Sequence, residues 1–188
     1  MKINLILLAA GNSSRFGTNK LLYEIDGTPM YRHVIQVIES LPKSIFSKKI
    51  IVSQYESILM DKDIKKSFTM VKNPDSSRGI SSSIHLGMEH SQEDADAWCF
   101  MVCDQPYMTK DTISNFVRSF MDSEKPLACV AYHNKWGNPT IFSNIFQREL
   151  MELSGDQGGK CIMEKHIQDV CCYQVANPKE LMDIDEPF

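Results

Sequence analysis

The sequence predicts an α/β fold with a mostly parallel central sheet. Short apolar runs bounded by turn residues alternate along the chain with segments whose apolar residues recur at helical spacing. Such alternation favours parallel strands joined by crossover helices. Polar, glycine-containing segments follow several of the apolar runs, at the strand ends where open α/β sheets bind ligands. The chain has 188 residues, and we expect residues 1–188 to form a single domain.

The first half of the chain opens with strand 3–9, INLILLA, an uninterrupted apolar run typical of a buried strand. Helix 29–41 begins with proline, which suits a first helical turn. One face of that helix carries Met30, Val34, Val37, Ile38 and Leu41. The other elements expected up to residue 91 are strand 48–54, helix 55–66, strand 68–73 and helix 79–91.

The second half opens with strand 96–104, DAWCFMVCD, which is strongly apolar and ends in an acid. Helix 109–123 begins with threonine, a good N-cap residue. The remaining expected elements are strands 126–134 and 138–143, helices 143–152 and 158–167, and strand 170–176. We find no internal repeat, linker or low-complexity tract.

Composition excludes several classes of function. The net charge is -4 and no basic stripe is present, so nucleic acid is not an expected partner. The apolar run INLILLAA has only eight residues, and we interpret it as a first strand, not a signal peptide. No apolar stretch is long enough to cross a membrane. We therefore expect a cytoplasmic protein with no membrane partner.

The six cysteines form no CxxC pair, and a zinc site would need better-spaced partners. Four of them lie in or beside predicted strands, which favours reduced, buried thiols. These four are Cys99, Cys103, Cys129 and Cys171.

The segment LLAAGNSSRFGTNKLL, residues 7–22, is a candidate phosphate-binding loop. Gly11 and Gly17 do not have P-loop spacing, and the absence of GxGxxG argues against an NAD(P) reductase. Small residues let backbone N–H groups approach an anion. Arg15 offers a planar fork to phosphate and Lys20 a mobile positive charge. A glycine-rich turn with two solvated cations explains the pattern equally well.

Three further segments carry polar groups that could bind a metal ion or a nucleotide, and two of them follow predicted strands. Asp104 follows an apolar strand, and Asp183 and Asp185 share one face if their segment is extended. One or two carboxylates together with substrate phosphates suit Mg²⁺, although a turn and a solvated acidic tail are the alternatives. Asn73 and Asp75, followed by several serines, offer hydrogen bonds to a base and ribose, or form an Asx turn and a helix start.

Together these segments resemble one known family. LAAGNSSRFGTNK, NPDSSRGISSSI, CDQP, WGNPTIF and LMDIDEPF follow one another in the order of its motifs. The family is that of the molybdopterin nucleotidyltransferases, and the resemblance is to its molybdenum cofactor cytidylyltransferase branch. The resemblance implies a three-layer, Rossmann-like (GT-A-like) fold with a mostly parallel central sheet.

The resemblance also implies roles for individual residues. Arg15 and Lys20 would act on the phosphates, with Asp104 as a catalytic residue. Asp104 and Asp185 would hold Mg²⁺. The nucleotide would contact Leu8, Ala9, Ala10, Gly11, Arg15, Lys20, Asn73, Asp75, Gly79, Ser82 and Ser83. The second substrate would contact Gly137, Asn138 and Pro139. In this tripeptide Asn138 stands where the family has histidine.

The implied reaction is transfer of CMP from CTP to the phosphate of molybdenum-molybdopterin, with release of pyrophosphate. Guanylyltransferase relatives tend to carry LAGG and a PLAG-like stretch, whereas this chain has Ala9-Ala10-Gly11 and GISSS. No protein nucleophile is expected, since positioning and charge stabilisation supply most of the rate of phosphate transfer. Ser82 and Ser83 would leave room for a pyrimidine.

Two other functions fit the same residues. One is a nucleotidyltransferase for another phosphorylated small molecule, such as a sugar or methylerythritol phosphate. The other is a non-catalytic escort that binds the finished cofactor and delivers it to an apo-molybdenum hydroxylase. That hydroxylase is a possible partner both of the escort and of an enzyme that retains its product.

Overall fold

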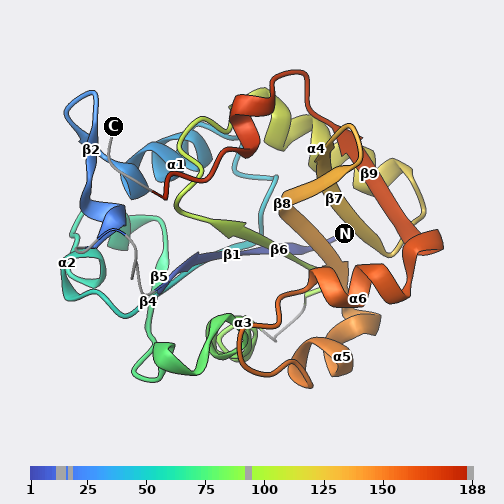
Figure 1. Cartoon of the computed structure of the whole chain (residues 1–188), viewed down its shortest axis with the longest axis horizontal. Helices are drawn as coiled ribbons and strands as arrows, with labels where there is room; N and C mark the ends of the chain where they lie inside the picture. Colours follow the sequence, from blue (N-terminus) through green and yellow to red (C-terminus); the bar gives the residue numbers. More distant parts are fainter. Residues whose placement is uncertain (12–15, 17–18, 92–94, 186–188) are drawn as a thin grey trace.

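A computed structural model describes residues 1–11, 16, 19–91 and 95–185. Its centre is a sheet of seven strands in the order β5-β4-β1-β6-β8-β7-β9 (Figure 1). The strands, in chain order, are β1 Ile3–Ala9, β4 Lys48–Ser53, β5 Thr69–Lys72, β6 Ala97–Val102, β7 Leu127–Tyr132, β8 Lys135–Ser143 and β9 Val170–Gln174.

Most neighbouring strands are parallel, as predicted. β1 lies between β4 and β6 and is parallel to both, and β5 and β9 are parallel to their neighbours β4 and β7. β8 is the exception, because it runs antiparallel to both β6 and β7. The carboxyl ends of β1, β4, β5 and β6 therefore meet at one edge of the sheet.

Helices cover both faces of the sheet, which gives three layers (Figure 1). α1 Met30–Glu39 and α4 Lys110–Asp122 cover one face, and α3 Ile80–Glu89, α5 Gln147–Met151 and α6 Lys160–Lys165 cover the other. Two apolar clusters fill the space between the layers. Alternation along β1 divides its side chains between them, so Leu5 and Leu7 pack beneath α1 whereas Ile6 packs beneath α3.

The expected helix 55–66 is wrong. Only α2, Glu56–Leu59, and a 3-10 turn at Ile64–Lys66 form there. Asp61 lies between them, and its carboxylate accepts hydrogen bonds from the backbone N–H of Asp63 at 3.1 Å and from the Tyr31 hydroxyl at 3.0 Å. An aspartate that bonds to nearby backbone competes with the helical pattern, and here it interrupts the helix.

Several element boundaries also differ from the prediction. The expected helix 143–152 begins as a 3-10 turn at Asn144–Phe146, and the expected strand 138–143 starts earlier, at Lys135. A small hairpin of β2 Glu24–Ile25 and β3 Thr28–Pro29 was not predicted. Its turn uses positive φ at Asp26 and Gly27, which is the conformation that an Asp-Gly pair favours.

The cysteines follow the expectation in part. Cys99, Cys103 and Cys129 are buried, but Cys171 is only half-buried and Cys172 is exposed. Burial raises the pKa of the Cys99 and Cys103 thiols well above the ordinary range, and the charge of Asp104 adds to the effect at Cys103. None of the helices in the described part of the chain is long and apolar enough to cross a membrane.

Candidate functional site

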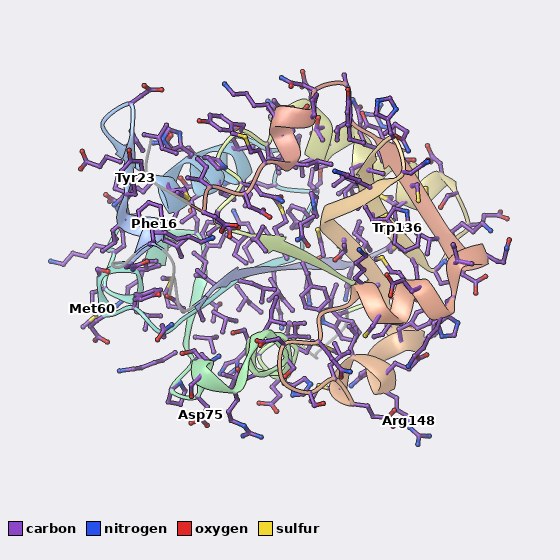
Figure 2. All side chains as sticks on the ribbon, viewed as in Figure 1. Phe16, Tyr23, Met60, Asp75, Trp136 and Arg148 are labelled. Atoms are coloured by element: carbon purple, nitrogen blue, oxygen red, sulfur yellow. The ribbon has the colours of Figure 1, made fainter. Side chains whose placement is uncertain are left out.

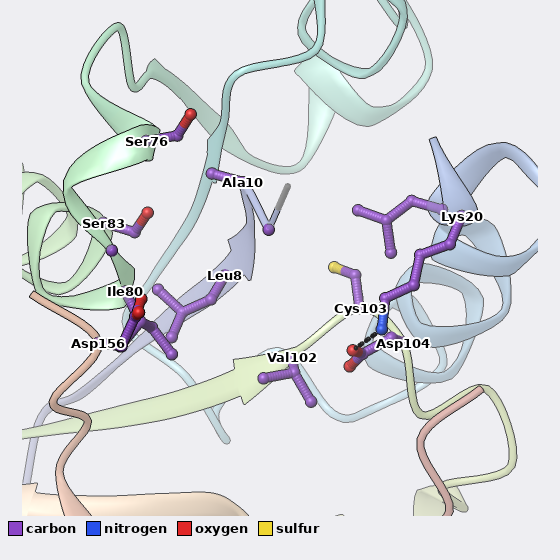
Figure 3. Close-up of a pocket in the computed structure, with 13 residues that line it drawn as sticks. Leu8, Ala10, Lys20, Ser76, Ile80, Ser83, Val102, Cys103, Asp104 and Asp156 are labelled. Atoms are coloured by element: carbon purple, nitrogen blue, oxygen red, sulfur yellow. Dashed lines mark ion pairs between the residues drawn. The ribbon is translucent and has the colours of Figure 1, made fainter. Parts of the chain in front are cut away.

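A cavity of about 210 Å³ opens at the carboxyl ends of β1 and β6 (Figure 3). The opening loop, the start of α3 and the segment after β6 supply its walls. The residues that line it are Leu8, Ala10, Gly11, Lys20, Leu21, Ser76, Gly79, Ile80, Ser83, Val102, Cys103, Asp104 and Asp156.

Six of the residues predicted to contact the nucleotide line this cavity: Leu8, Ala10, Gly11, Lys20, Gly79 and Ser83. Asp104 lines it as well, beside Lys20 and on the side opposite Ser76 and Ser83 (Figure 3). The structure thus brings together segments that are about 70 to 90 residues apart in the sequence. Arg15, the other predicted phosphate contact, lies outside the described residues.

Four of the predicted nucleotide contacts do not line the cavity. Ala9 is buried in β1 with 1% of its surface exposed, and Asn73 is buried to the same degree. The Asn73 amide nitrogen donates to the Ser82 and Ser83 hydroxyls, each at 2.9 Å. Asn73 and Ser82 therefore do not line the cavity. Asn73 instead holds the hydroxyl of Ser83, which does line it.

Asp75 lies on a different surface from the one predicted. Its side chain is on the outside of the molecule, beside α3 (Figure 2). There it lines a separate polar groove together with Arg78, His85 and Glu89. The Asx-turn alternative holds for this segment, since the backbone N–H of Asp75 donates to the Asn73 side chain at 2.9 Å.

Lys20 lies between the two carboxylates predicted to hold metal. Its Nζ is 2.7 Å from Asp104 Oδ2 and 2.9 Å from Asp185 Oδ1. Burial lowers the pKa of Lys20, but the contacts with Asp104 and Asp185 outweigh it and leave the pKa above its ordinary value. Lys20 is therefore a cation at neutral pH, and it joins the start of the chain to its last described residue.

Asp104 has one carboxylate oxygen that suits a metal ion. Asp104 Oδ1 is buried and has no hydrogen-bond partner among the described residues. A buried, unpaired carboxylate oxygen is costly unless a cation or donor completes it. The described residues contain no group of three or more His, Cys, Asp or Glu side chains that could hold a metal. Two carboxylates with phosphate and water ligands are, however, a set that Mg²⁺ accepts.

Asp183, the other acid of the final segment, is held by a neighbouring side chain. Gln105 Nε2 donates to Asp183 Oδ1 at 2.9 Å. Burial raises the pKa of Asp183, and the nearby charge of Asp104 adds to the shift. Asp183 thus contributes to the attachment of the final segment, while Asp185 contacts Lys20.

Glu180 is a buried residue of this segment that the sequence analysis did not single out. Its carboxylate accepts hydrogen bonds from the backbone N–H of Thr109 at 3.1 Å and from the Thr109 hydroxyl at 2.9 Å. Thr109 is the N-cap of α4. The contact anchors the 3-10 turn Pro178–Leu181 on α4 and leads the chain back towards Asp104.

A second cavity, of about 140 Å³, adjoins the first, and Leu8 and Ile80 line both. Gly137 and Asn138, which were predicted to contact a second substrate, are in its wall, whereas Pro139 is not. Trp136 and Lys160 also line it, and Trp136 lies on the β8 side of the molecule (Figure 2). The wall is largely apolar, with aromatic rings from Phe100 and Phe142.

Asp156 is a cavity residue that sequence reasoning missed. It belongs to the segment SGDQGGK, residues 154–160, whose glycine content was the available signal. This segment packs closely on Gly79, where a Cβ atom would be 2.3 Å from the Gly155 carbonyl and 2.6 Å from Asp156 Oδ1. Gly79 also has φ +91°, so glycine is required at this contact.

Comparison with known proteins identifies similar nucleotidyltransferases. The MobA-like NTP transferase domain matches residues 5–170. The probable molybdenum cofactor guanylyltransferase of Pyrococcus horikoshii is 27% identical over 170 residues, which cover 84% of this chain and 76% of that protein. The molybdenum cofactor guanylyltransferase of Vibrio cholerae is 28% identical over 152 residues, 79% of this chain and 68% of that protein.

The fold has solved counterparts. The crystal structure of Rv0371c from Mycobacterium tuberculosis superposes with a TM-score of 0.80 at 20% identity, covering 99% of this chain and 94% of that one. Because the family match spans most of the chain and includes both the opening loop and Asp104, this protein belongs to the MobA-like NTP transferase domain family.

Proposed function

We propose that the protein is a Mg²⁺-dependent, cytoplasmic nucleotidyltransferase that transfers CMP from CTP to the phosphate of molybdenum-molybdopterin. The products are molybdopterin cytosine dinucleotide and pyrophosphate. The ion pairs that join Asp185 to Lys20, and Lys20 to Asp104, are the observation that favours this reaction, since Lys20 and Asp104 line the first cavity. A cation next to two carboxylates, beside a backbone loop of small residues, suits a polyphosphate and its counter-ion.

In this reaction an oxygen of the acceptor phosphate attacks the α-phosphorus of CTP. A new P–O bond forms, the bond to the β-phosphate oxygen breaks, and pyrophosphate leaves with that electron pair. The backbone of residues 8–11 holds the nucleotide, and Lys20 and Arg15 neutralise charge on the phosphates. The protein mainly positions the reactants, so no side chain becomes covalently modified.

The two carboxylates next to Lys20 are the residues that would hold Mg²⁺. When bound, the ion neutralises phosphate charge that builds up during transfer. Lys20 keeps Asp104 and Asp185 close together without the ion and is long enough to turn to a phosphate oxygen.

The acceptor would occupy the second cavity. Its aromatic and apolar wall suits a flat ring system, and Lys160 offers a cation for an acidic group. Because Leu8 and Ile80 line both cavities, two substrates bound there would be neighbours. That arrangement is required for direct transfer.

Two nucleotides compete for the first cavity. Ala10 lines it and takes up space that glycine would leave in the LAGG sequence of guanylyltransferase relatives, which supports the smaller base of CTP. Transfer of GMP from GTP is the second candidate, because both curated relatives described above are guanylyltransferases.

A nucleotide panel tests the proposal. The enzyme is incubated with Mg²⁺, molybdenum-molybdopterin and each of CTP, GTP, ATP and UTP, and pyrophosphate release is followed. We expect release with CTP; release with GTP alone would replace the cytidylyl assignment with the guanylyl one. Tight binding of the dinucleotide product without release from any nucleotide would indicate an escort for molybdenum hydroxylases. Release only with another phosphorylated acceptor would identify a different substrate.

The variant Ala10→Gly provides a direct test of the base. Removing the methyl group enlarges the first cavity and leaves more room for the larger base of GTP. The ratio of kcat/KM for GTP to that for CTP should therefore rise. Gly158→Ala, at a position that lines only the second cavity, is the control and should leave this ratio unchanged.

A further inference from the structure

Three consecutive side chains at the end of β4 and just beyond it donate hydrogen bonds to three consecutive backbone carbonyls at the start of the opening loop. Ser53 Oγ donates to Ala9 O at 2.9 Å, and Gln54 Nε2 donates to Ala10 O at 2.8 Å. The Tyr55 hydroxyl donates to Gly11 O at 2.5 Å. The last two carbonyls belong to residues that line the first cavity.

These bonds fix which way the peptide groups of the loop face. In a trans peptide the C=O of one residue and the N–H of the next point in opposite directions. The carbonyls of Ala9 and Ala10 point to the β4 side, so the N–H groups of Ala10 and Gly11 point away from it. β6 lies on the other side of β1 from β4, and the cavity wall there includes Asp104.

Carbonyl oxygens that faced the cavity would repel a triphosphate, whereas N–H groups attract it. Gln54 and Tyr55 are only half-buried, and each side chain reaches a backbone oxygen of the loop. Neither side chain lines the cavity, so neither contacts a ligand there.

The same segment is joined to the second wall of the cavity. The Ser53 carbonyl accepts a hydrogen bond from the backbone N–H of Asn73 at 2.9 Å. Asn73 in turn donates to Ser82 and Ser83, and Ser83 lines the cavity. One hydrogen-bonded chain therefore spans the ends of β1, β4 and β5 and reaches both the loop and α3.

We infer that Gln54 and Tyr55 are positioning residues for the nucleotide: they hold the carbonyls of Ala10 and Gly11 away from the cavity, and the bond from Gln54 thereby presents the Gly11 N–H group to the phosphates. This inference rests on the proposed function, because it requires a nucleotide in the first cavity. It assigns a role in nucleotide affinity to a segment that touches neither substrate.

The test compares Tyr55→Phe, Gln54→Leu and wild type in calorimetric titrations with CTP and with GTP, each with Mg²⁺ and no acceptor. Tyr55→Phe removes only the hydroxyl, and Gln54→Leu keeps the size of the side chain but not its donor. Tyr173→Phe on β9, at the opposite edge of the sheet, is the matched control. Melting temperature is measured for every variant.

We expect each variant to raise the Kd of the bound nucleotide about 3- to 10-fold, the effect of one hydrogen bond. In turnover, KM for the nucleotide should rise by a similar factor while kcat and KM for the acceptor stay within about twofold of wild type. Tyr173→Phe should match wild type in every measurement.

Unchanged nucleotide Kd in both Tyr55→Phe and Gln54→Leu, when wild type binds the nucleotide, would overturn the inference and leave the proposed function in place. A lower melting temperature with unchanged Kd would assign these residues to stability alone and also overturn it. No binding of CTP or GTP by wild type would overturn the proposed function and this inference with it.

Discussion

Lys20 was predicted to contact phosphate, and the structure also places it against both candidate metal ligands. Its ammonium contacts both candidate metal ligands, and its side chain lines the cavity proposed for the triphosphate. Two carboxylates at such close range would repel one another, and the cation between them offsets that repulsion. The orphaned Asp104 Oδ1 remains available beside them.

Replacing Asp104 by asparagine tests the importance of this carboxylate. The amide keeps the size of the side chain but removes the charge that would hold Mg²⁺, so we expect kcat to fall about 100- to 1,000-fold. Pyrophosphate release measures the effect. Asp183→Asn, in which the changed group faces Gln105, is the control, and an equal loss in that variant would show that the metal ligands are assigned incorrectly.

Alkylation of the native protein tests the placement of the cysteines. Only the thiolate reacts, and the raised pKa values of the buried Cys99 and Cys103 leave almost none at pH 8. Iodoacetamide should therefore label the exposed Cys172 and spare Cys99 and Cys103, as read by mass spectrometry of peptides. Labelling of all three at similar rates without denaturant would contradict the burial described here.

At the scale of elements, the glycine before α3 allows two segments of the cavity wall to pack against each other. Gly79 has positive φ, and the segment that carries Asp156 packs directly on its backbone. The alternation of strands and helices was predictable because each element carries its own periodicity. The closeness of Gly79 to Gly155 was not, because nothing in the sequence near either residue encodes a contact between segments 76 residues apart.

Gly79→Ala should both strain the backbone and separate these segments. We expect the free energy of unfolding to fall by about 2 kcal/mol or more and nucleotide affinity to fall with it. Urea denaturation and nucleotide titration measure the two effects. Gly158→Ala, where the added Cβ would be 4.0 Å from its nearest neighbour, should change stability by less than about 0.5 kcal/mol. Similar losses in both variants would refute the special role of Gly79.

The failure of helix 55–66 has a cause at this same scale. Its apolar spacing was suitable, but Asp61 bonds to Asp63 and Tyr31 instead of leaving the backbone in a helix. The contact with Tyr31 is tertiary, so periodicity could not reveal it. The Asp-Gly turn of the β2–β3 hairpin, by contrast, was encoded locally and could have been recognised.

At the scale of the whole molecule, one sheet joins the first and last parts of the chain. The strand order places β1 in the interior of the sheet, next to the central strand β6, with apolar clusters on both faces. The fold class was predictable from the alternation of strands and helices. The closeness of the opening loop to Asp104 was predictable because the carboxyl ends of parallel strands meet at one edge of the sheet. The burial of Asn73 against Ser83 and the position of Asp75 on the outside of the molecule were not predictable, because side-chain direction in a turn depends on tertiary contacts.

A continuous sheet predicts a single cooperative unfolding transition for residues 1–188. Trp98 lies in the core between β6 and α3, whereas Trp136 lines the second cavity, so fluorescence senses both regions. Urea curves from fluorescence and from far-ultraviolet circular dichroism should coincide. Two separate midpoints would indicate two folding units.

The bond between Lys20 and Asp185 joins residues 165 positions apart. A ribosome makes the sheet and all the helices that cover it before it adds the second carboxylate of the site. A chain truncated just before Asp185 would keep the strands and helices described above but would lack this carboxylate. The apolar core of such a chain would stay covered, so measurements of folding would reveal little, and assays of the proposed metal and nucleotide binding would be needed to detect the loss.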